Sequence, residues 1–461
     1  MEKIISLQNS TFFEKVNKVH FVGVGGVSLS SLCILTRHIG LHVTGSDIAE
    51  SREFDKLKNM GIEVYLGHNG CNVADDVDMV VYSGAIDESN VELEVAKSRG
   101  IKVVERSEYL GEICKLYDNV IAVAGSHGKT TTTAMITHVF DVAGLNPTMH
   151  LGGECVDYGN LRLGSYQVMI TEACEYRNSM AYIRPNVAVI TNIDNDHLDY
   201  YKTQKSLIKA FVKFSRQVQE YLFVSSERKF RQIGRECDLI SVGFNNNQRI
   251  YAKNIVETSK GYKFEVVCDG EKLAKFKLNI LGRHNIRNAL FAIAVAKTYD
   301  IKLSKIKKGI RTFRGVRRRY EKIGEIARVP IISDYAHHPT EIRNSIAGLS
   351  RKYRRLLVVF QPHTYSRTEL CLKEFSNSFE KAKNVIIYKT YPAREEYNPK
   401  GDEKILLNAI NNKRKQNVDS VEEIFVRINE IIAGKKIDAV VVMGAGDMPI
   451  KMEKILNKTK V

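Results

Sequence analysis

The sequence contains no tryptophan, few prolines and no apolar run long enough to cross a membrane. A membrane-spanning helix needs about 20 consecutive, mostly apolar residues, and no segment approaches that length. The first residues, MEKIISLQNSTFFEKVNK, interrupt their apolar stretches with polar and acidic side chains, which is not typical of a secretion signal. We therefore expect a cytoplasmic protein that has no membrane partner.

The cysteines are scattered along the chain, and no two of them form a C-x-x-C pair. They are Cys33, Cys71, Cys114, Cys155, Cys174, Cys237, Cys268 and Cys371. This spacing indicates neither a zinc knuckle nor a thioredoxin-like redox site. We expect reduced thiols, most of them buried.

Acidic residues are fewer than basic ones: the sequence has 53 Asp and Glu and 69 Lys and Arg, which gives a net charge of +16. A basic excess can mark a nucleic-acid-binding surface. Here, however, the basic residues are spread along the chain, no recognised nucleic-acid motif accompanies them, and lysine-rich helix faces are usually solvated surface. We expect no nucleic-acid partner, because a substrate with several phosphates explains part of the excess equally well.

Short apolar strands, each followed by a loop and a helical stretch, recur along the chain and predict α/β architecture. At 461 residues the chain exceeds the size of a single hydrophobic core. We predict three doubly wound domains, residues 1–118, 119–315 and 316–461. The outer two are Rossmann-like, and the central one is a P-loop ATPase-type domain whose mostly parallel sheet carries a small antiparallel sheet at 249–280. Expected strands are 19–23, 42–44, 78–83, 119–124, 168–171, 187–190, 330–333, 356–360, 384–388 and 439–443, with helices at 27–39 and 285–297.

A phosphate-binding loop, Gly125-Ser126-His127-Gly128-Lys129-Thr130, follows the strand 119–124 and opens a helix. Glycines let the backbone N–H groups point at phosphate oxygens, and the helix N-terminus adds its positive end. The lysine can then reach the β- and γ-phosphates of ATP, and the threonine hydroxyl can ligate Mg²⁺. The spacing from the first glycine to the lysine is shorter than in the common form, which argues against a generic GTPase or motor ATPase.

Two later strands end in clusters of potential metal ligands. Glu172 and Glu175 follow the strand 168–171, and Asp194, Asp196 and His197 follow the strand 187–190. Ligands of open α/β sheets collect at such strand ends, and Mg²⁺ prefers oxygen ligands. Each residue alone would be interpreted as a helix cap or a core side chain. After a phosphate loop, they indicate one Mg²⁺ site and a second cation site, for which Mn²⁺ is an alternative.

The N-terminal segment Gly23-Val24-Gly25-Gly26-Val27-Ser28 follows a strand and opens a helix, and Asp47 comes about twenty residues later. This pattern is typical of a dinucleotide-binding fingerprint, although serine replaces the third glycine. A helix N-terminus with an open backbone binds a diphosphate whatever the rest of the ligand is. An NAD-dependent oxidoreductase with an accessory ATPase-like domain is therefore one alternative, and a nucleotide-binding regulatory module without turnover is another.

Seven motifs occur in the order seen in the Mur ligase family: GSHGKTTT, TEACEYRNSM, AVITNIDNDHLDYY, LGRHNIRNA, DYAHHPTEI, FQPHTYSRT and VVMGAGD. The resemblance covers nearly the whole chain, from HFVGVGGVSLSSLC to the last strand. AHHPTE, QPHTYSRT and the histidine of the phosphate loop are similar to the L-alanine-adding member more than to its siblings. One departure is Val212, which stands where several siblings carry a carbamylated lysine, so we predict no modified lysine.

The resemblance implies an ATP-dependent ligase of peptidoglycan precursor synthesis. ATP would phosphorylate the carboxylate of UDP-N-acetylmuramate, and the amine of L-alanine would attack the acyl phosphate, releasing ADP and phosphate. A sibling ligase that adds another amino acid or a recycled peptide is the alternative. The family also implies ATP and Mg²⁺ as cofactors and a monomer or weak homodimer.

The resemblance also implies roles for single residues. The catalytic set is Lys129, His197, His337, His363 and Arg367. The ATP-binding set is Gly125, Ser126, His127, Gly128, Lys129, Thr130, Thr131, His284, Asn288, Arg319 and Asp334. The UDP-sugar-binding set is Gly25, Gly26, Val27, Ser28, Ser46, Asp47, Ser83 and Asn192, and the metal ligands are Thr130, Glu172 and His197. A zinc site at His337-His338 is a rival interpretation that lacks an acidic or cysteine partner at metal spacing.

Overall fold

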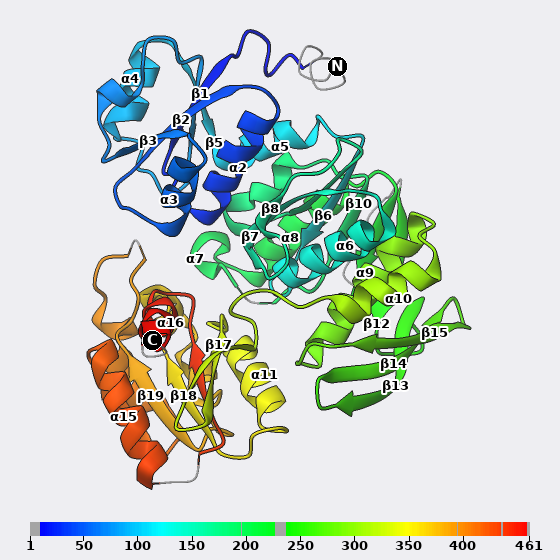
Figure 1. Ribbon diagram of the computed structural model, residues 1–461, viewed down its shortest axis with the longest axis vertical. Coiled ribbons are helices and arrows are strands. Elements are labelled where there is room, and N and C mark those ends of the chain that lie inside the picture. The colour runs from blue at the N-terminus through cyan, green and yellow to red at the C-terminus, as the bar shows by residue number, and fades with distance from the viewer. Residues whose placement is uncertain (1–9, 195, 226–236, 394, 435–436, 459–461) are drawn as a thin grey trace. The chain divides into compact units, whose positions relative to one another are not determined.

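The computed structural model describes residues 10–194, 196–225, 237–393, 395–434 and 437–458 (Figure 1). The chain forms two compact units. The first comprises Met1–Asn279 and Ile286–Gly315, and the second comprises Ile280–Asn285 and Val316–Val461. No helix in the described ranges is both long and apolar enough to span a membrane.

The N-terminal part of the first unit is a parallel five-stranded sheet in the order β3-β2-β1-β4-β5. Its strands are β1 (Lys18–Val22), β2 (His42–Asp47), β3 (Glu63–Leu66), β4 (Met79–Tyr82) and β5 (Lys102–Glu105), and its helices are α2 (Val27–His38), α3 (Arg52–Asn59), α4 (Val91–Ser98) and α5 (Arg106–Cys114). The strand order reverses between β1 and β4, so a ligand crevice is expected at the carboxyl ends of these strands. The predicted Rossmann-like arrangement is confirmed.

The rest of the first unit is built on a ten-stranded sheet in the order β15-β14-β13-β12-β11-β10-β6-β9-β7-β8. Its strands are β6 (Asn119–Ala124), β7 (Thr148–Cys155), β8 (Gly159–Arg162), β9 (Val168–Glu172), β10 (Val187–Ile190), β11 (Tyr221–Val224), β12 (Asp238–Gly243), β13 (Ile250–Thr258), β14 (Gly261–Cys268) and β15 (Glu271–Leu278). Its helices are α6 (Lys129–Ala143), α7 (Leu198–Tyr201), α8 (Gln204–Ser215), α9 (His284–Thr298) and α10 (Leu303–Thr312). The strands from β12 to β7 are parallel, whereas two-residue turns join β13, β14 and β15 in antiparallel order, as predicted.

The second unit is a six-stranded sheet in the order β16-β17-β21-β18-β19-β20, in which only β16 is antiparallel to its neighbour. The strands are β16 (Glu321–Ile326), β17 (Val329–Asp334), β18 (Leu356–Phe360), β19 (Asn384–Tyr388), β20 (Lys415–Val418) and β21 (Ala439–Met443). The helices are α11 (Pro339–Leu349), α12 (Tyr365–Leu370), α13 (Leu372–Ser376), α14 (Glu403–Ala409), α15 (Val421–Gly434) and α16 (Met448–Lys458). Alternate residues of β18 enter two different core clusters, so both faces of this sheet are covered, which explains its uninterrupted apolar strands.

All eight cysteines are free thiols, and only Cys71 is exposed. Burial raises the pKa of the Cys114 thiol to about 12, which keeps it protonated and unreactive. The expectation of reduced thiols agrees with these positions, although several of the others are only partly buried.

Candidate functional site

The phosphate loop turns from β6 into α6 through two glycines with left-handed backbone. Gly125 has a φ of 125° and Gly128 a φ of 87°, conformations that glycine adopts without steric cost. A Cβ atom on Gly125 would lie 2.1 Å from the Thr191 hydroxyl, and one on Gly128 would lie 2.9 Å from the Asn288 side-chain oxygen. The motif glycines are therefore required by the backbone and by the neighbours that pack on it.

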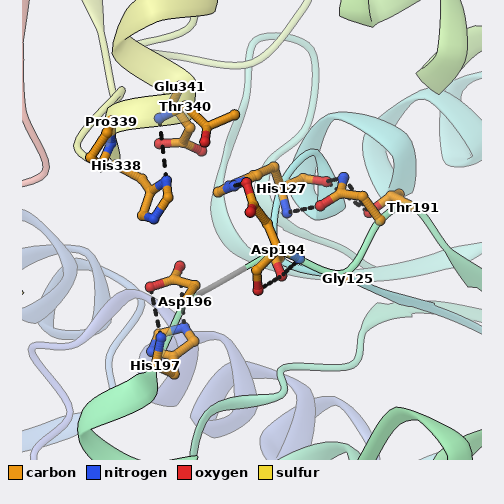
Figure 2. Close-up of polar contacts among 12 residues, drawn as sticks. Gly125, His127, Thr191, Asp194, Asp196, His197, His338, Pro339, Thr340 and Glu341 are labelled. Carbon is orange, nitrogen blue, oxygen red and sulfur yellow. Dashed lines mark hydrogen bonds and ion pairs between the residues drawn. The ribbon is translucent and has the colours of Figure 1, made fainter. Parts of the chain in front are cut away.

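The segment after β10 holds the loop in place. The His127 amide donates to Asn192 Oδ1 (3.0 Å), and the Asn192 Nδ2 and Thr191 Oγ1 atoms donate to the His127 carbonyl at 2.8 and 2.7 Å. His127 Nε2 lies 3.2 Å from Asp194 Oδ2, as Figure 2 shows. The Asn192 amide, which we predicted to contact the UDP-sugar, is thus already paired with the loop backbone.

Lys129 is held at the start of α6 by Glu175. Its Nζ atom donates to both Glu175 carboxylate oxygens at 2.8 and 3.0 Å and to the Gly125 carbonyl at 2.6 Å. Burial opposes the charge on this lysine, but the Glu175 carboxylate outweighs burial and raises the pKa of Lys129. The loop therefore carries a fixed positive charge.

Two of the predicted metal ligands, Thr130 and Glu172, lie together. The Gly152 amide donates to Glu172 Oε1 at 2.9 Å. This amide and the nearby Thr130 hydroxyl both act to lower the pKa of Glu172. Burial is the larger influence and raises the pKa of Glu172. A divalent cation that binds at this hydroxyl and this carboxylate would favour the ionised form.

His197 lies beside Glu175 and Asp196. Its Nε2 atom is 3.6 Å from Glu175 Oε1 and 3.7 Å from Asp196 Oδ2, and one ligand atom from each of the three residues falls within 4.8 Å of the others. The ring also packs on Tyr176, with 4.9 Å between centroids. Two carboxylates and an imidazole form a donor set that suits a divalent cation. Of these three residues only His197 was predicted as a metal ligand, because Glu175 follows one strand whereas Asp196 and His197 follow another.

The glycine loop before α2 is held by the end of β2. The Gly23 and Val24 amides donate to the Ser46 carbonyl at 2.8 and 3.0 Å, and the Gly25 amide donates to Asp47 Oδ2 at 2.7 Å. A Cβ atom on Gly25 would lie 2.8 Å from that carboxylate oxygen. Asp47 therefore positions the loop, in addition to any contact it makes with a nucleoside.

Ser46 and Ser83, two other residues predicted to bind the UDP-sugar, differ in the burial and hydrogen bonding of their hydroxyl groups. The Ser46 hydroxyl is buried and donates to Glu92 at 2.6 Å, so it does not face solvent. Ser83 is half-buried, and its hydroxyl accepts from the Ala85 amide at 3.3 Å.

Arg106 reaches the first turn of α2 from the start of α5. Its Nη1 atom donates to Ser28 Oγ at 3.1 Å, and the same hydroxyl lies 3.1 Å from His150 Nε2. Burial, followed by the Arg106 charge, lowers the pKa of His150 to about 4. This arginine was not predicted, because nothing in its local sequence pattern distinguishes it from a surface residue.

In the second unit, Arg319 and Asp334 lie near Glu341. Arg319 Nη1 is 3.6 Å from Glu341 Oε1, and this carboxylate raises the pKa of the guanidinium although burial acts against it. Asp334 accepts from the Ala336 amide and from the Ser345 hydroxyl, both at 2.9 Å, while burial raises its pKa. Arg319 and Asp334, both predicted to contact ATP, therefore interact with the same carboxylate, that of Glu341.

His337, His363 and Arg367 also lie together in the second unit. The two imidazole centroids are 5.9 Å apart, and Arg367 Nη1 donates to the His363 carbonyl at 2.6 Å and lies 3.2 Å from its Nδ1 atom. Burial, followed by the Arg367 charge, lowers the pKa of His363 to about 4. His363 is therefore neutral near pH 7. Glu395, which the sequence analysis missed, accepts from the Ser366 amide at 2.8 Å in the same loop region.

His338, one half of the rival zinc interpretation, has a capping role in the second unit, and the zinc site stays an alternative prediction. The His338 Nδ1 atom caps α11 by accepting from the Thr340 amide at 3.3 Å (Figure 2). Within the described residues of the second unit, no three His, Cys, Asp or Glu side chains converge as a metal site.

His284 and Asn288 are one turn apart on α9, but the boundary between the two units passes between them. His284 packs near Tyr320 in the second unit, with ring centroids 5.8 Å apart, while buried Asn288 contacts Gly128 in the first. The joint contact with adenine stays a prediction.

Known protein families and individual relatives match this chain over nearly its full length. Family models described as "Mur ligase family, catalytic domain", "Mur ligase middle domain" and "Mur ligase, glutamate ligase domain" match residues 18–118, 123–296 and 318–446. The UDP-N-acetylmuramate–L-alanine ligase of Clostridium beijerinckii is 38% identical over 454 residues, covering 96% of this chain and 98% of its own length. Its counterpart from Clostridium novyi is 39% identical and covers 94% of this chain and 95% of its own length.

Solved structures show the same fold. The crystal structure of UDP-N-acetylmuramate-alanine ligase from Thermotoga maritima superposes with a TM-score of 0.81 at 26% identity, covering 96% of this chain and 99% of the other. A murein peptide ligase from Psychrobacter arcticus, 24% identical with a TM-score of 0.71, shares the fold over 96% of this chain and 98% of its own. The matched domains, the sequence identity over nearly the full length and the common three-domain fold together show that this chain belongs to the Mur ligase family.

Proposed function

We propose that the protein is an ATP-dependent ligase that joins L-alanine to the carboxylate of UDP-N-acetylmuramate in peptidoglycan precursor synthesis. The observation that carries the proposal is the phosphate loop in which Lys129 is fixed as a cation beside Thr130 and Glu172, within a chain whose relatives carry that ligase name. The likeness to the Thermotoga maritima enzyme supports it across all three domains.

The reaction proceeds in two displacements. An oxygen of the muramate carboxylate attacks the γ-phosphorus of ATP, and ADP leaves. The amine of L-alanine then attacks the acyl carbonyl, loses a proton and expels phosphate, so that an amide replaces the acyl phosphate. The protein positions the reactants and stabilises the negative charge that spreads over the transferred phosphoryl group.

In the first unit, Lys129 exchanges its contact with Glu175 for the γ-phosphate. Thr130 and Glu172 would hold one Mg²⁺, and His197 with Glu175 and Asp196 would hold a second divalent cation; these ions neutralise phosphate charge. The backbone amides of Lys129 to Thr131, at the start of α6, would face the β- and γ-phosphates, whereas the amides of Ser126 and His127 already donate to Asn192.

We assign the domains by the residues they contribute. Residues 1–118 bind the UDP-sugar, with its diphosphate at Gly25, Gly26, Val27 and Ser28 and with Arg106 as an added cation. Residues 119–315 bind ATP, and residues 316–461 supply Arg319 and Asp334 to ATP. Neutral His363 can accept a hydrogen bond from the alanine amine group, and Arg367 suits a carboxylate through its planar fork.

The test is release of ADP and phosphate with UDP-N-acetylmuramate and each of L-alanine, glycine, L-serine, D-glutamate and a tripeptide, with product masses measured. We expect L-alanine to give the highest kcat/KM and Lys129→Ala to abolish turnover. Turnover that ignores the amino acid would reject a ligase, and preference for the tripeptide would identify the peptide-recycling sibling. Nicotinamide binding to the first domain with activity retained in Lys129→Ala would support the oxidoreductase alternative.

A further inference from the structure

The antiparallel strands β13, β14 and β15 and the helix α10 line a hollow of about 730 Å³ in the first unit. Figure 1 shows these elements side by side in the green part of the chain. None of the lining residues belongs to the phosphate loop, to the N-terminal glycine loop or to the candidate metal ligands. The hollow is therefore a separate feature, which the proposed ligase reaction does not use.

The lining is strongly basic. Its six cationic side chains are Lys263, Lys275, Lys277, Lys307, Lys308 and Arg311, and Glu265 is its only acidic residue. Glu265 is already satisfied, because it lies 3.1 Å from Lys272 and 3.7 Å from Lys275 and accepts from Asn254 at 3.2 Å. Apart from Lys275, none of the lining cations pairs with a carboxylate in the part of the chain that the structure describes.

The cations are neighbours on both walls. Lys263 and Lys277 are directly opposite in the antiparallel pairing of β14 with β15, and Lys307 and Arg311 are four residues apart on α10. Like charges in both arrangements are destabilising. An anion bound between the sheet and α10 would offset this repulsion. The offset is larger for a ligand that carries more negative charge in a small volume.

The size of the hollow and the character of its lining limit the ligand. Pockets of about 300–1,000 Å³ hold small molecules, whereas a stable protein interface buries about 800 Å² on each partner. Phe264 and Phe276 border the hollow, but their stacked rings (centroids 6.0 Å apart) are buried on the sheet face opposite to Lys263 and Lys277; exposed Val256 is paired with Lys263 and shares its face. Because Lys263, Lys277 and Val256 share the exposed face, the lysine stems can cover apolar surface while their ammonium groups meet a compact anion.

We propose that this hollow binds a small ligand with a chain of phosphate groups, independently of the phosphate loop. The phosphate chain, with three or more charges close together, is the chemistry that several adjacent lysines and an arginine recognise best. Free polyphosphate and a nucleoside triphosphate share this chemistry.

The experiment compares two double variants, in α10 and at its N-terminus, that remove the same charge. Lys307→Gln with Lys308→Gln alters the hollow, whereas Lys302→Gln with Lys305→Gln alters exposed lysines on the same segment outside the lining. Both are made in the full chain carrying Lys129→Ala, which weakens competing binding at the phosphate loop. Titration calorimetry with tripolyphosphate should give a Kd about tenfold higher for the first pair and a change of less than about twofold for the control pair.

ATP is the second arm of the titration. Equal dependence of ATP and tripolyphosphate on Lys307 and Lys308 would show that the phosphate chain is recognised alone, and stronger dependence for ATP would show that the nucleoside contributes. Equal losses in the two double variants would overturn the proposal, because general electrostatic attraction would then explain binding. Tighter, lining-dependent binding of a poly-glutamate peptide or a single-stranded oligonucleotide would also overturn it.

A second lining variant guards against a folding defect. Lys263→Gln with Lys277→Gln should weaken tripolyphosphate binding by a similar factor, although its residues lie on the sheet. Because it removes a like-charge pair, its Tm without ligand should be equal to or above that of the parent. A lower Tm without ligand, or unchanged affinity, would contradict the site.

Discussion

The Lys129 ammonium group is held between a buried carboxylate and a carbonyl group of its own loop. In Glu175→Gln the carboxylate is lost, so a largely buried cation keeps only neutral partners. Breaking one side of a buried pair costs about 3–5 kcal/mol, and with 14% of the lysine side chain exposed we expect about 3 kcal/mol. Urea unfolding without nucleotide measures this loss.

The double variant Lys129→Met with Glu175→Gln is compared with the Glu175→Gln single variant. Because it removes both charges, it should recover part of the lost stability. A surface pair serves as the control: Lys115 and Glu112 form an ion pair at 2.6 Å in which the lysine side chain is exposed. Neutralising that pair should cost less than about 1 kcal/mol. Equal stability of the Glu175 single variant and the double variant would contradict the buried pair.

The motif identified Lys129 and Thr130, and the strand-end argument identified Glu172. These residues could be predicted because glycine spacing and strand ends are local features of the sequence. Arg106 could not, since its partner Ser28 is 78 residues away and depends on how α5 and α2 pack. For the same reason, the sequence does not predict that the Ser46 hydroxyl is buried against Glu92, which is 46 residues away.

At the scale of elements, the predicted strands are those with apolar side chains on both faces, such as β18 and β21. The edge strands β3, β5, β8, β16 and β20 were not predicted, and neither were the internal strands β7, β11 and β12. In β3, β5 and β20 few residues are fully buried. Edge strands tolerate charge and need little apolar pattern, so periodicity alone does not reveal them.

The contact of α10 with α6 leads to a prediction about a helical glycine. A Cβ atom on Gly309 would lie 2.9 Å from both the Cα and the Cγ2 atoms of Val139, so Gly309→Ala forces the two helices apart. Overpacking of this kind costs about 1–3 kcal/mol, which exceeds the gain of about 1 kcal/mol in helix propensity. We expect a lower Tm in a thermal scan.

Gly434, the last residue of α15, is the matched control. A Cβ atom there meets nothing within 4 Å, so Gly434→Ala should be neutral or stabilising by up to about 1 kcal/mol. Gly309→Ala as stable as the parent would show that the helix contact is looser than the structure indicates.

For the whole molecule, the two units carry buried ionisable groups whose protonation opposes folding. The pKa values of His150 and His363 are lowered from 6.5 to about 4, chiefly by burial. The unfolded chain therefore binds protons at these histidines between about pH 6.5 and pH 4, where the folded chain does not. Stability should fall through that window as the pH decreases, by roughly 2 kcal/mol per histidine between pH 7 and pH 5.

Glu92 affects stability in a lower pH range than the two histidines. Burial opposes its charge, but the His20 imidazole at 3.7 Å and the hydrogen bonds from Ser46 and Asn72 outweigh burial and lower its pKa from 4.5 to about 2. Its contribution is present above pH 4.5 and is lost as the pH falls toward 2, because only the unfolded carboxyl group takes up a proton in between.

Urea unfolding at intervals from pH 7 to pH 3 separates the two contributions. His150→Gln should flatten the decline between pH 6.5 and pH 4 and leave the lower decline in place. Glu92→Gln should lower stability at pH 7, since the amide cannot replace a charged acceptor of several hydrogen bonds, and should flatten the curve only below about pH 4.5. If His150→Gln instead steepened the decline above pH 4, the imidazole would be charged in the folded protein, and its contact with Ser28 beside Arg106 would have to be reassigned.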